Sequence, residues 1–259
     1  MTQTKTYEGI HIKNGQPSKV SDALVVEAAL QININKEPYT VVMRTPGDDF
    51  QLIRGLLFAE DIYKETENLT TKIVEQKENG FSIINVNIQK NYLGKGYLNK
   101  RTLLSVSSCG ICGKQKLDDI VFTGSKLKNS IAIDTHKIEG MFAQMKQNQA
   151  TFELSGGSHA AAIFNINYNL LTLKEDIGRH NAVDKVIGEL LNAKKLKEAA
   201  ILLVSGRVSY EIISKAFIAK IPVVVAVSAC STLAVDFAKE FGICLIGFSR
   251  GKKATLYSK

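Results

Sequence analysis

The distribution of apolar and polar residues differs between the two halves of the chain. In the C-terminal half, short continuous apolar runs alternate with stretches in which apolar residues recur every three or four positions. Continuous apolar strands that alternate with helices are typical of a largely parallel sheet covered on both faces. The runs predict strands at residues 160–164, 170–173, 200–204, 223–227 and 243–246, and the periodic stretches predict helices at 181–191, 210–219 and 232–241.

The N-terminal half carries hairpin patterns instead. Residues 1–20 are polar with scattered apolar positions, which predicts an edge strand or an arm. Apolar runs at 23–26 and 39–43 lie on either side of a turn-forming stretch, and runs at 72–74 and 81–86 lie on either side of a second one. These patterns predict two hairpins in a mostly antiparallel sheet.

Two more helices are predicted between these regions. One opens with Thr45 as its N-cap and Pro46 at its first position, and acidic residues follow in the first turn. The other occupies 134–149, where apolar residues recur at helical spacing behind a capping residue. We therefore predict an α/β protein in two parts, with a smaller, mostly antiparallel α+β part at 1–133 and an α/β domain at 134–259.

Composition narrows the class of protein. A chain of 259 residues, 45% of them hydrophobic, can bury a large core without disulfides or a structural metal. Four cysteines, no secretory signal and no apolar run of about eighteen residues favour a cytoplasmic protein that does not enter a membrane. The formal net charge of +8 favours anionic partners. Nucleic acid is not expected, because the chain has no recognisable nucleic-acid-binding motif.

Two of the four cysteines form a Cys-x-x-Cys unit outside any apolar periodicity. Cys109 and Cys112 are each followed by a glycine, and Lys114 adds positive charge that favours the reactive thiolate. The pair could form a disulfide, share a metal or pass a sulfur atom. A closed zinc site is disfavoured because the chain has no second such pair, whereas thioredoxin-like redox work stays open. Cys230 and Cys244 fit small buried hydrophobes better.

Small hydroxyl residues and glycines lie where predicted strands enter helices. Free N–H groups at helix starts bind anions, and open α/β sheets bind ligands at the carboxyl ends of their strands. Each junction alone could be only a helix cap. Together with glycine-containing loops at 155–159 and 247–253, the junctions predict a site for a large anionic ligand such as a nucleotide. The candidate ligand-binding residues at these junctions are Arg179, His180, Ser205, Gly206, Arg207 and Ser228.

The order of elements in the C-terminal half resembles the cytidine-deaminase-like fold, a three-layer α/β/α architecture. The zinc signature of the deaminases is His-x-Glu on one helix and Pro-Cys-x-x-Cys at the start of the next. Here His180 is followed by Asn181 and Ala182, and the second junction, 205–209, contains no cysteine. We therefore expect the architecture without deaminase chemistry.

Six segments distributed through nearly the whole chain, in order, resemble the formate dehydrogenase accessory sulfurtransferases, the FdhD family. The longest reads Glu-Asp-Ile-Gly-Arg-His-Asn-Ala-Val-Asp-Lys, which is highly specific. One departure is Cys230, where the family pattern has a proline. The six segments are 45–49, 108–113, 156–161, 175–185, 205–207 and 247–251.

The resemblance implies a cytoplasmic, homodimeric sulfur carrier. Such a carrier accepts persulfide sulfur from a cysteine desulfurase and delivers it to a molybdenum cofactor with two pterin–guanine dinucleotides, for use by formate dehydrogenase. Cys109 would accept the sulfur and Cys112 would assist it. The resemblance also assigns cofactor binding to a stretch near the C-terminus, in which the cationic side chains would contact phosphate. That stretch comprises Phe248, Ser249, Arg250, Gly251, Lys252 and Lys253.

Two other functions fit the same residues. The chain could bind and protect the cofactor as a chaperone without transferring sulfur, or it could act as a dithiol oxidoreductase through Cys109 and Cys112. The sequence does not separate these alternatives from sulfur transfer.

Overall fold

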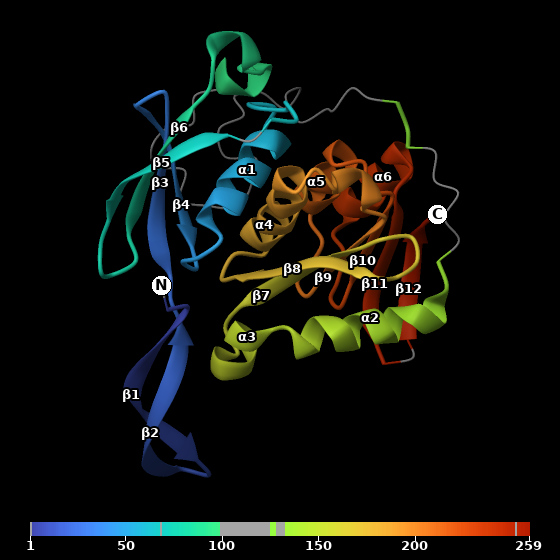
Figure 1. The fold of residues 1–259 in the computed structure, drawn as a ribbon. Helices are drawn as coiled ribbons and strands as arrows, with labels where there is room; N and C mark the ends of the chain where they lie inside the picture. Colours follow the sequence, from blue (N-terminus) through green and yellow to red (C-terminus); the bar gives the residue numbers. More distant parts are fainter. Residues whose placement is uncertain (1, 68, 99–124, 128–132, 252) are drawn as a thin grey trace.

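The computed structural model describes residues 2–67, 69–98, 125–127, 133–251 and 253–259. The described residues form a six-stranded sheet, a four-stranded sheet and a two-stranded ribbon. Figure 1 shows the two larger sheets with helices between them and the ribbon extending away from both. Among the described residues, no helix is both long and apolar enough to cross a bilayer.

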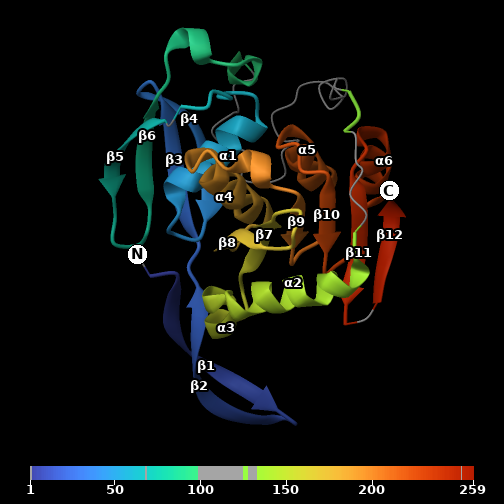
Figure 2. The same ribbon diagram turned by 45° about the vertical axis from the view of Figure 1, so that its right-hand side comes forward.

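The ribbon consists of β1 (Thr4–Lys13) and β2 (Gln16–Val25), paired antiparallel along their whole length. It confirms the predicted N-terminal arm, and Figures 1 and 2 both show it projecting from the body. An isolated two-stranded ribbon is only marginally stable, so its attachment at the base matters. There the Val26 amide donates to the Gln3 carbonyl at 2.8 Å, and the Gln3 side-chain amide donates to the Pro46 carbonyl at 3.2 Å.

The four-stranded sheet has the order β4-β3-β6-β5. Its strands are β3 (Ala28–Ile34), β4 (Glu37–Arg44), β5 (Thr70–Gln76) and β6 (Ser82–Asn87). Two pairs are antiparallel and the central pair, β3 with β6, is parallel, so the mostly antiparallel sheet is confirmed.

The second predicted hairpin is confirmed as β5 and β6, but the first is only half right. Its turn lies at residues 35–36, yet the strand before the turn is β3, whereas residues 23–25 end β2 in the ribbon. Every second side chain of β3, from Ala28 to Ile34, is buried. This alternation, rather than the continuous apolar run before it, was the strand signal.

Helix α1 (Asp49–Ala59) packs one face on this sheet, with Leu52, Ile53, Leu56 and Leu57 in a shared core. Thr45 is not its N-cap, and the prediction was wrong. The N-cap is Asp48, in the left-handed region at φ 55°. Thr45 instead bonds to a distant segment, because its hydroxyl accepts from the Ile177 amide at 3.0 Å. Two short 3-10 turns follow the sheet, Lys90–Tyr92 and Lys95–Leu98.

The six-stranded sheet has the order β12-β11-β10-β9-β7-β8. Strands β9, β10 and β11 are parallel, and β8 runs in the same direction because β7 is antiparallel to both β8 and β9. The largely parallel sheet is therefore confirmed. The strands are β7 (His159–Phe164), β8 (Leu170–Asp176), β9 (Ile201–Val204), β10 (Val223–Ala226), β11 (Cys244–Arg250) and β12 (Lys253–Ser258).

The predicted loop at 247–253 needs a correction. Residues 247–250 continue β11, and Lys253 begins β12, which pairs antiparallel with β11. The chain turns at Gly251, where φ is 56°. The side chains of β12 are mostly exposed and its apolar residues form no long continuous run, so the sequence carried no signal of a buried strand there.

Helices cover both faces of this sheet, as predicted. One face carries α4 (Arg179–Asn192), α5 (Tyr210–Ile218) and α6 (Thr232–Phe241) over a single apolar core. The other carries α2 (Thr135–Gln147), with Ile138, Met141 and Met145 against the strands; α3 (Ala150–Ser155) follows it. Figures 1 and 2 show these three layers. The Asp134 carboxylate accepts from the His136 amide at 2.9 Å, which confirms the predicted cap.

Candidate functional site

The candidate residues that the structure describes lie along one edge of the six-stranded sheet. The carboxyl ends of the parallel strands β8 to β11 meet there, together with the amino end of β7. The edge crosses four strand spacings from β8 to β11, about 19 Å. A ligand that reaches both ends must therefore be elongated.

Backbone bonds join the neighbouring strand ends along this edge. The Ser205 amide donates to the Ala160 carbonyl at 3.0 Å, which links β9 to β7. The Phe248 amide donates to the Ser228 carbonyl, also at 3.0 Å, and the Arg250 Nε atom donates to the Val227 carbonyl at 3.3 Å. The residues after Gly247 therefore lie beside the turn that follows β10. This agrees with the prediction that both segments belong to one nucleotide site.

At the middle of the edge, His159 from β7 meets the turn after β9. The Ser205 hydroxyl accepts from the Ala160 amide at 2.9 Å and lies 3.5 Å from His159 Nδ1. A methyl group on Gly206 would come within 3.2 Å of His159 Nδ1 and 3.3 Å of Arg179 Cδ. The turn after β9 therefore packs closely against both the imidazole and the arginine.

A second polar group lies at the starts of α4 and α5. His180 is 4% exposed, and its Nε2 atom lies 3.0 Å from Ser209 Oγ and 3.6 Å from Glu211 Oε2. Burial by itself raises the pKa of Glu211, but hydrogen bonds from His180 and Ser209 outweigh it and hold this pKa at about 2. The Glu211 carboxylate is therefore ionised at neutral pH.

Burial and nearby positive charge both lower the pKa of His159. Burial lowers the pKa of His159, and Arg179, His180 and Arg207 lower it further, while Asp176 opposes them. The imidazole is therefore neutral at pH 7 within a positively charged surrounding.

Three buried polar atoms at this edge have no hydrogen-bond partner among the described residues. They are Arg179 Nε, His180 Nδ1 and Ser249 Oγ. Buried donors and acceptors are normally satisfied, so such atoms require an explanation. All three belong to residues predicted from the sequence as ligand-binding, and a bound polar ligand would satisfy them.

The helix starts at this edge differ in how they are capped. Ser231 caps α6 by accepting from the Ala234 amide at 3.2 Å. The serine at this junction therefore serves as a helix cap, which was the alternative to ligand binding. Among the described residues, neither Gly178 before α4 nor Ser209 before α5 caps its helix with a side chain, but the Glu211 carboxylate accepts from its own amide in the first turn of α5. The N-terminal amides of α4 can therefore serve an anion.

The thiol of Cys230 lies near the same edge, beside Gly247. Burial raises the pKa of Cys230 to about 11, and burial also raises the pKa of Cys244 in β11. Both thiols stay protonated at neutral pH, which agrees with their interpretation as small buried hydrophobes. Among the described residues, no group of His, Cys, Asp and Glu could hold a metal ion.

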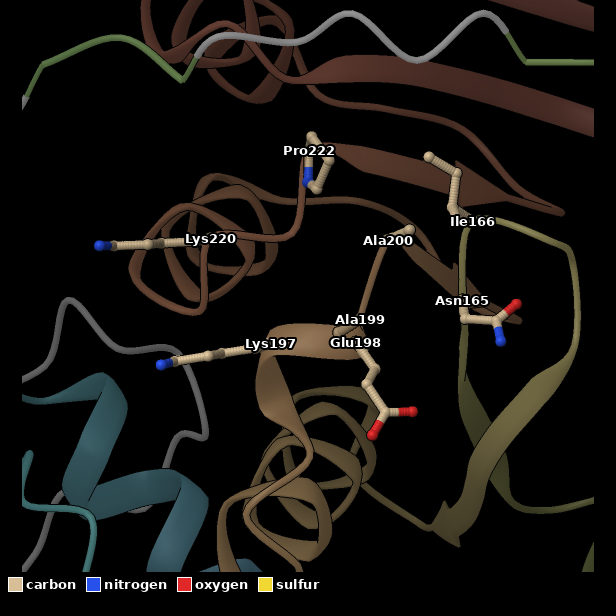
Figure 3. A pocket seen from close by; sticks show the side chains of 8 residues that line it. All are labelled: Asn165, Ile166, Lys197, Glu198, Ala199, Ala200, Lys220 and Pro222. Atoms are coloured by element: carbon tan, nitrogen blue, oxygen red, sulfur yellow. The ribbon is translucent and has the colours of Figure 1, made fainter.

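A hollow of about 470 Å³ lies at the opposite edge of the sheet (Figure 3). Ala200 and Pro222 in its wall precede β9 and β10, so it opens at the amino ends of these strands. It is lined by Asn165, Ile166, Lys197, Glu198, Ala199, Ala200, Lys220 and Pro222. It contains no candidate residue and does not belong to the site described above.

Sequence reasoning missed His159, Ser209 and Glu211. His159 was visible as the last residue of the glycine-containing loop 155–159, and Ser209 closes the junction 205–209. Their grouping with His180 depends on the sheet order. Cys109, Cys112 and Lys252 lie outside the described residues. Phe248, Arg250 and Lys253 are exposed, whereas Ser249 is buried, and Gly251 forms the turn between β11 and β12.

Comparison with known proteins gives a consistent result. The model of the FdhD/NarQ family matches residues 25–259. A protein of Mycobacterium tuberculosis named "Sulfur carrier protein FdhD" is 38% identical over 262 residues, which cover 96% of this chain and 94% of that protein. One of the same name from Saccharolobus solfataricus is 37% identical, over 99% and 96% of the two chains.

One solved structure has the same fold. It is described as a formate dehydrogenase accessory protein of Desulfotalea psychrophila, and it superposes with a TM-score of 0.77. The match covers 100% of this chain and 98% of the other at 20% identity. At this identity the likeness concerns the fold, and it confirms the mixed α/β architecture.

Proposed function

The chain belongs to the FdhD/NarQ family, and on that premise we propose that it is a sulfur carrier required for formate dehydrogenase activity. It accepts sulfur from the persulfide of a cysteine desulfurase and transfers it to a molybdenum cofactor that carries two pterin–guanine dinucleotides. That cofactor is its substrate. The names of the relatives support sulfur carriage, and the edge of the six-stranded sheet supports the binding of a nucleotide-bearing molecule.

The observation that carries the nucleotide site is the set of unpartnered buried atoms on Arg179, His180 and Ser249. Phosphate oxygens would accept from the arginine and from the uncapped amides of α4. The exposed Arg250 and Lys253, with Lys252, would contact further phosphates. The ligand-binding roles of Ser205, Gly206, Arg207, Ser228, Phe248 and Gly251 belong to the same proposal.

The first sulfur-transfer step is assigned to Cys109. Its thiolate attacks the outer sulfur of the donor persulfide, the sulfur–sulfur bond of the donor breaks, and the donor cysteine leaves as a thiolate. Cys109 then carries the persulfide, which Cys112 shares or relays. The raised pKa values of the Cys230 and Cys244 thiols support the assignment of sulfur carriage to the Cys-x-x-Cys pair.

Several finer features are part of this proposal. We assign the C-terminal domain, 134–259, to the cytidine-deaminase-like fold, supported by its order of strands and helices. The N-terminal part, 1–133, contacts it closely through α1 and α4. We further propose a cytoplasmic homodimer with no structural metal and no nucleic-acid partner.

Sulfur loading tests the proposal directly. Incubation with a cysteine desulfurase and sulfur-labelled cysteine should place a cyanide-labile label on Cys109, and Cys109→Ala should lose it. Cys230→Ala is the matched control and should keep full labelling. Label on Cys230 or Cys244 in the unmodified protein would refute the assignment.

Cys109→Ala also distinguishes sulfur transfer from the second candidate function, that of a cofactor-binding chaperone. The polar groups at the edge of the six-stranded sheet support both functions equally well. Under sulfur transfer, Cys109→Ala abolishes activation of the client formate dehydrogenase. Under the chaperone alternative, activation by Cys109→Ala matches that by the unmodified protein. Insulin reduction by the purified protein would instead favour the dithiol oxidoreductase.

A further inference from the structure

His159 holds a central position on the ligand-binding edge that no role yet explains. It is the first residue of β7, between the carboxyl ends of β8 and β9, and it pairs in register with Asp176. Its ring lies against the turn after β9, with Ser205 Oγ 3.5 Å from Nδ1 and the Cα of Gly206 turned towards it. His159 as a whole is half-buried.

The charges that face His159 come from three elements. Arg179 and His180 belong to α4, Arg207 to the turn after β9, and Asp176 to the end of β8. The Asp176 carboxylate is already paired, since it lies 2.8 Å from the Lys185 ammonium group. It opposes the effect of the cations on His159 less strongly than Arg179 imposes it, and neither Arg179 nor Arg207 has an ion-pair partner among the described residues.

We propose that His159 is a further ligand-binding residue of this edge, one that takes up a proton from solvent and donates a hydrogen bond when a phosphate group binds beside Arg179 and Arg207. This inference rests on the proposed nucleotide site. It adds His159 to the ligand-binding residues, and it adds that phosphate binding is coupled to protonation of this residue.

The direction of the coupling follows from the charges. In the free protein, burial and the neighbouring cations keep the pKa of His159 below its usual value. A bound phosphate offsets those cations and raises this pKa. At a pH below the pKa of His159 in the free protein, the imidazole is protonated with or without bound phosphate. At a pH above its pKa in the bound protein, the imidazole is neutral in both states. Proton uptake is therefore confined to the window between the two values, and affinity rises as pH falls through that window.

Titration with GDP as the probe tests the inference. Calorimetry in two buffers of different ionisation enthalpy, at about pH 6.5, should show greater proton uptake for the unmodified protein than for His159→Gln. The variant should bind GDP roughly tenfold more weakly at about pH 6 and less than about threefold more weakly at about pH 8, since a charge-assisted bond is lost only where the imidazole is protonated. Comparison of the two proteins cancels the titration of GDP itself.

Two further measurements make the outcome decisive. His136→Gln, on the exposed start of α2, is the matched control and should behave as the unmodified protein. NMR titration of the unmodified protein should show the pKa of His159 rising when GDP is bound, which does not depend on the variant folding. Equal proton uptake in both proteins, or an unchanged His159 pKa, would overturn the role of His159 while leaving the nucleotide site intact. Failure of the unmodified protein to bind GDP would overturn both.

Discussion

At the scale of single residues, Glu211 shows how the fold holds charges in place at the candidate edge of the six-stranded sheet. Its side chain is buried in the first turn of α5, where the helix dipole favours negative charge. His180 and Ser209 donate to it, which holds its pKa at about 2 against the effect of burial. The same contacts orient the His180 ring, whose other nitrogen has no partner among the described residues.

The pH dependence of unfolding measures how much the ionised Glu211 contributes to stability. Because the folded pKa of Glu211 lies below its usual value, the residue stabilises the fold above about pH 4.5, and this contribution is lost as pH falls towards 2. Between about pH 5 and pH 2.5, the unfolding free energy of the unmodified protein should fall by on the order of 2 kcal/mol more than that of Glu211→Gln. Urea unfolding at each pH gives both values.

The matched control for this comparison is Glu198→Gln, at an exposed carboxylate in the hollow of Figure 3. It should lose stability in parallel with the unmodified protein. A Glu211→Gln variant that also declines in parallel would contradict the assignment of the low pKa.

At the scale of elements, the two parts of the chain are joined by helices α1 and α4, which pack at backbone distance. A Cβ atom on Gly55 would overlap the carbonyl of Asp184, and one on Gly188 would overlap the carbonyl of Gln51. This approach places α1 between the four-stranded sheet and α4, as Figure 1 shows. The helix that bears Arg179 and His180 is thereby held from both sides, by the sheet beneath it and by α1.

Gly55→Ala should therefore push α1 and α4 apart. We expect a loss of unfolding free energy of about 3 kcal/mol or more, since backbone cannot yield as a flexible side chain can. The control is Gly140→Ala in α2, where a Cβ atom meets nothing within 4 Å. That variant should gain up to about 1 kcal/mol from helix propensity. Denaturant unfolding measures both, and equal stability of the two variants would contradict the close packing.

At the scale of the whole molecule, a buried ion pair links the segment before α1 to the candidate edge of the six-stranded sheet. Asp176 and Lys185 are fully buried and 2.8 Å apart. The Asp176 carboxylate also accepts from the Thr45 amide at 3.1 Å, and the Lys185 ammonium group donates to the Thr45 carbonyl at 3.0 Å. Two of the segments that carry the family resemblance thus form one contact between the two parts of the chain.

Removing one member of this pair should destabilise the whole molecule. Lys185→Met leaves the Asp176 carboxylate buried without its counter-charge, which costs about 3–5 kcal/mol of unfolding free energy. Lys239→Met, on the exposed last turn of α6, should change stability by less than about 0.5 kcal/mol. Urea unfolding decides the matter, and a Lys185→Met variant within about 1 kcal/mol of the unmodified protein would show that the pair is dispensable.

Much of the C-terminal half of the chain could be predicted from the sequence, because the residues of each element carry their own pattern of apolar and polar positions. The apolar runs that became β7 to β11 and the three-to-four periodicity of α4 to α6 both describe which side chains an element buries. Since parallel strands end at a common edge, the candidate residues from Arg179 to Ser249 could also be placed together in advance. The mostly exposed β12 and the alternating β3 gave weaker signals and were missed or misplaced.

Periodicity shows that a side chain is buried, but not which other element buries it. Thr45 reads as a helix cap, yet it bonds to Asp176, 131 positions away. His159 reads as the end of a loop, yet it meets Ser205, 46 positions away. The sequence alone therefore determined most of the elements, their order and the Cys-x-x-Cys pair. Tertiary packing decided the grouping of His159 with Arg179, the ionised state of Glu211 and the protonated state of Cys230, because burial and charge depend on neighbours brought together only by the fold.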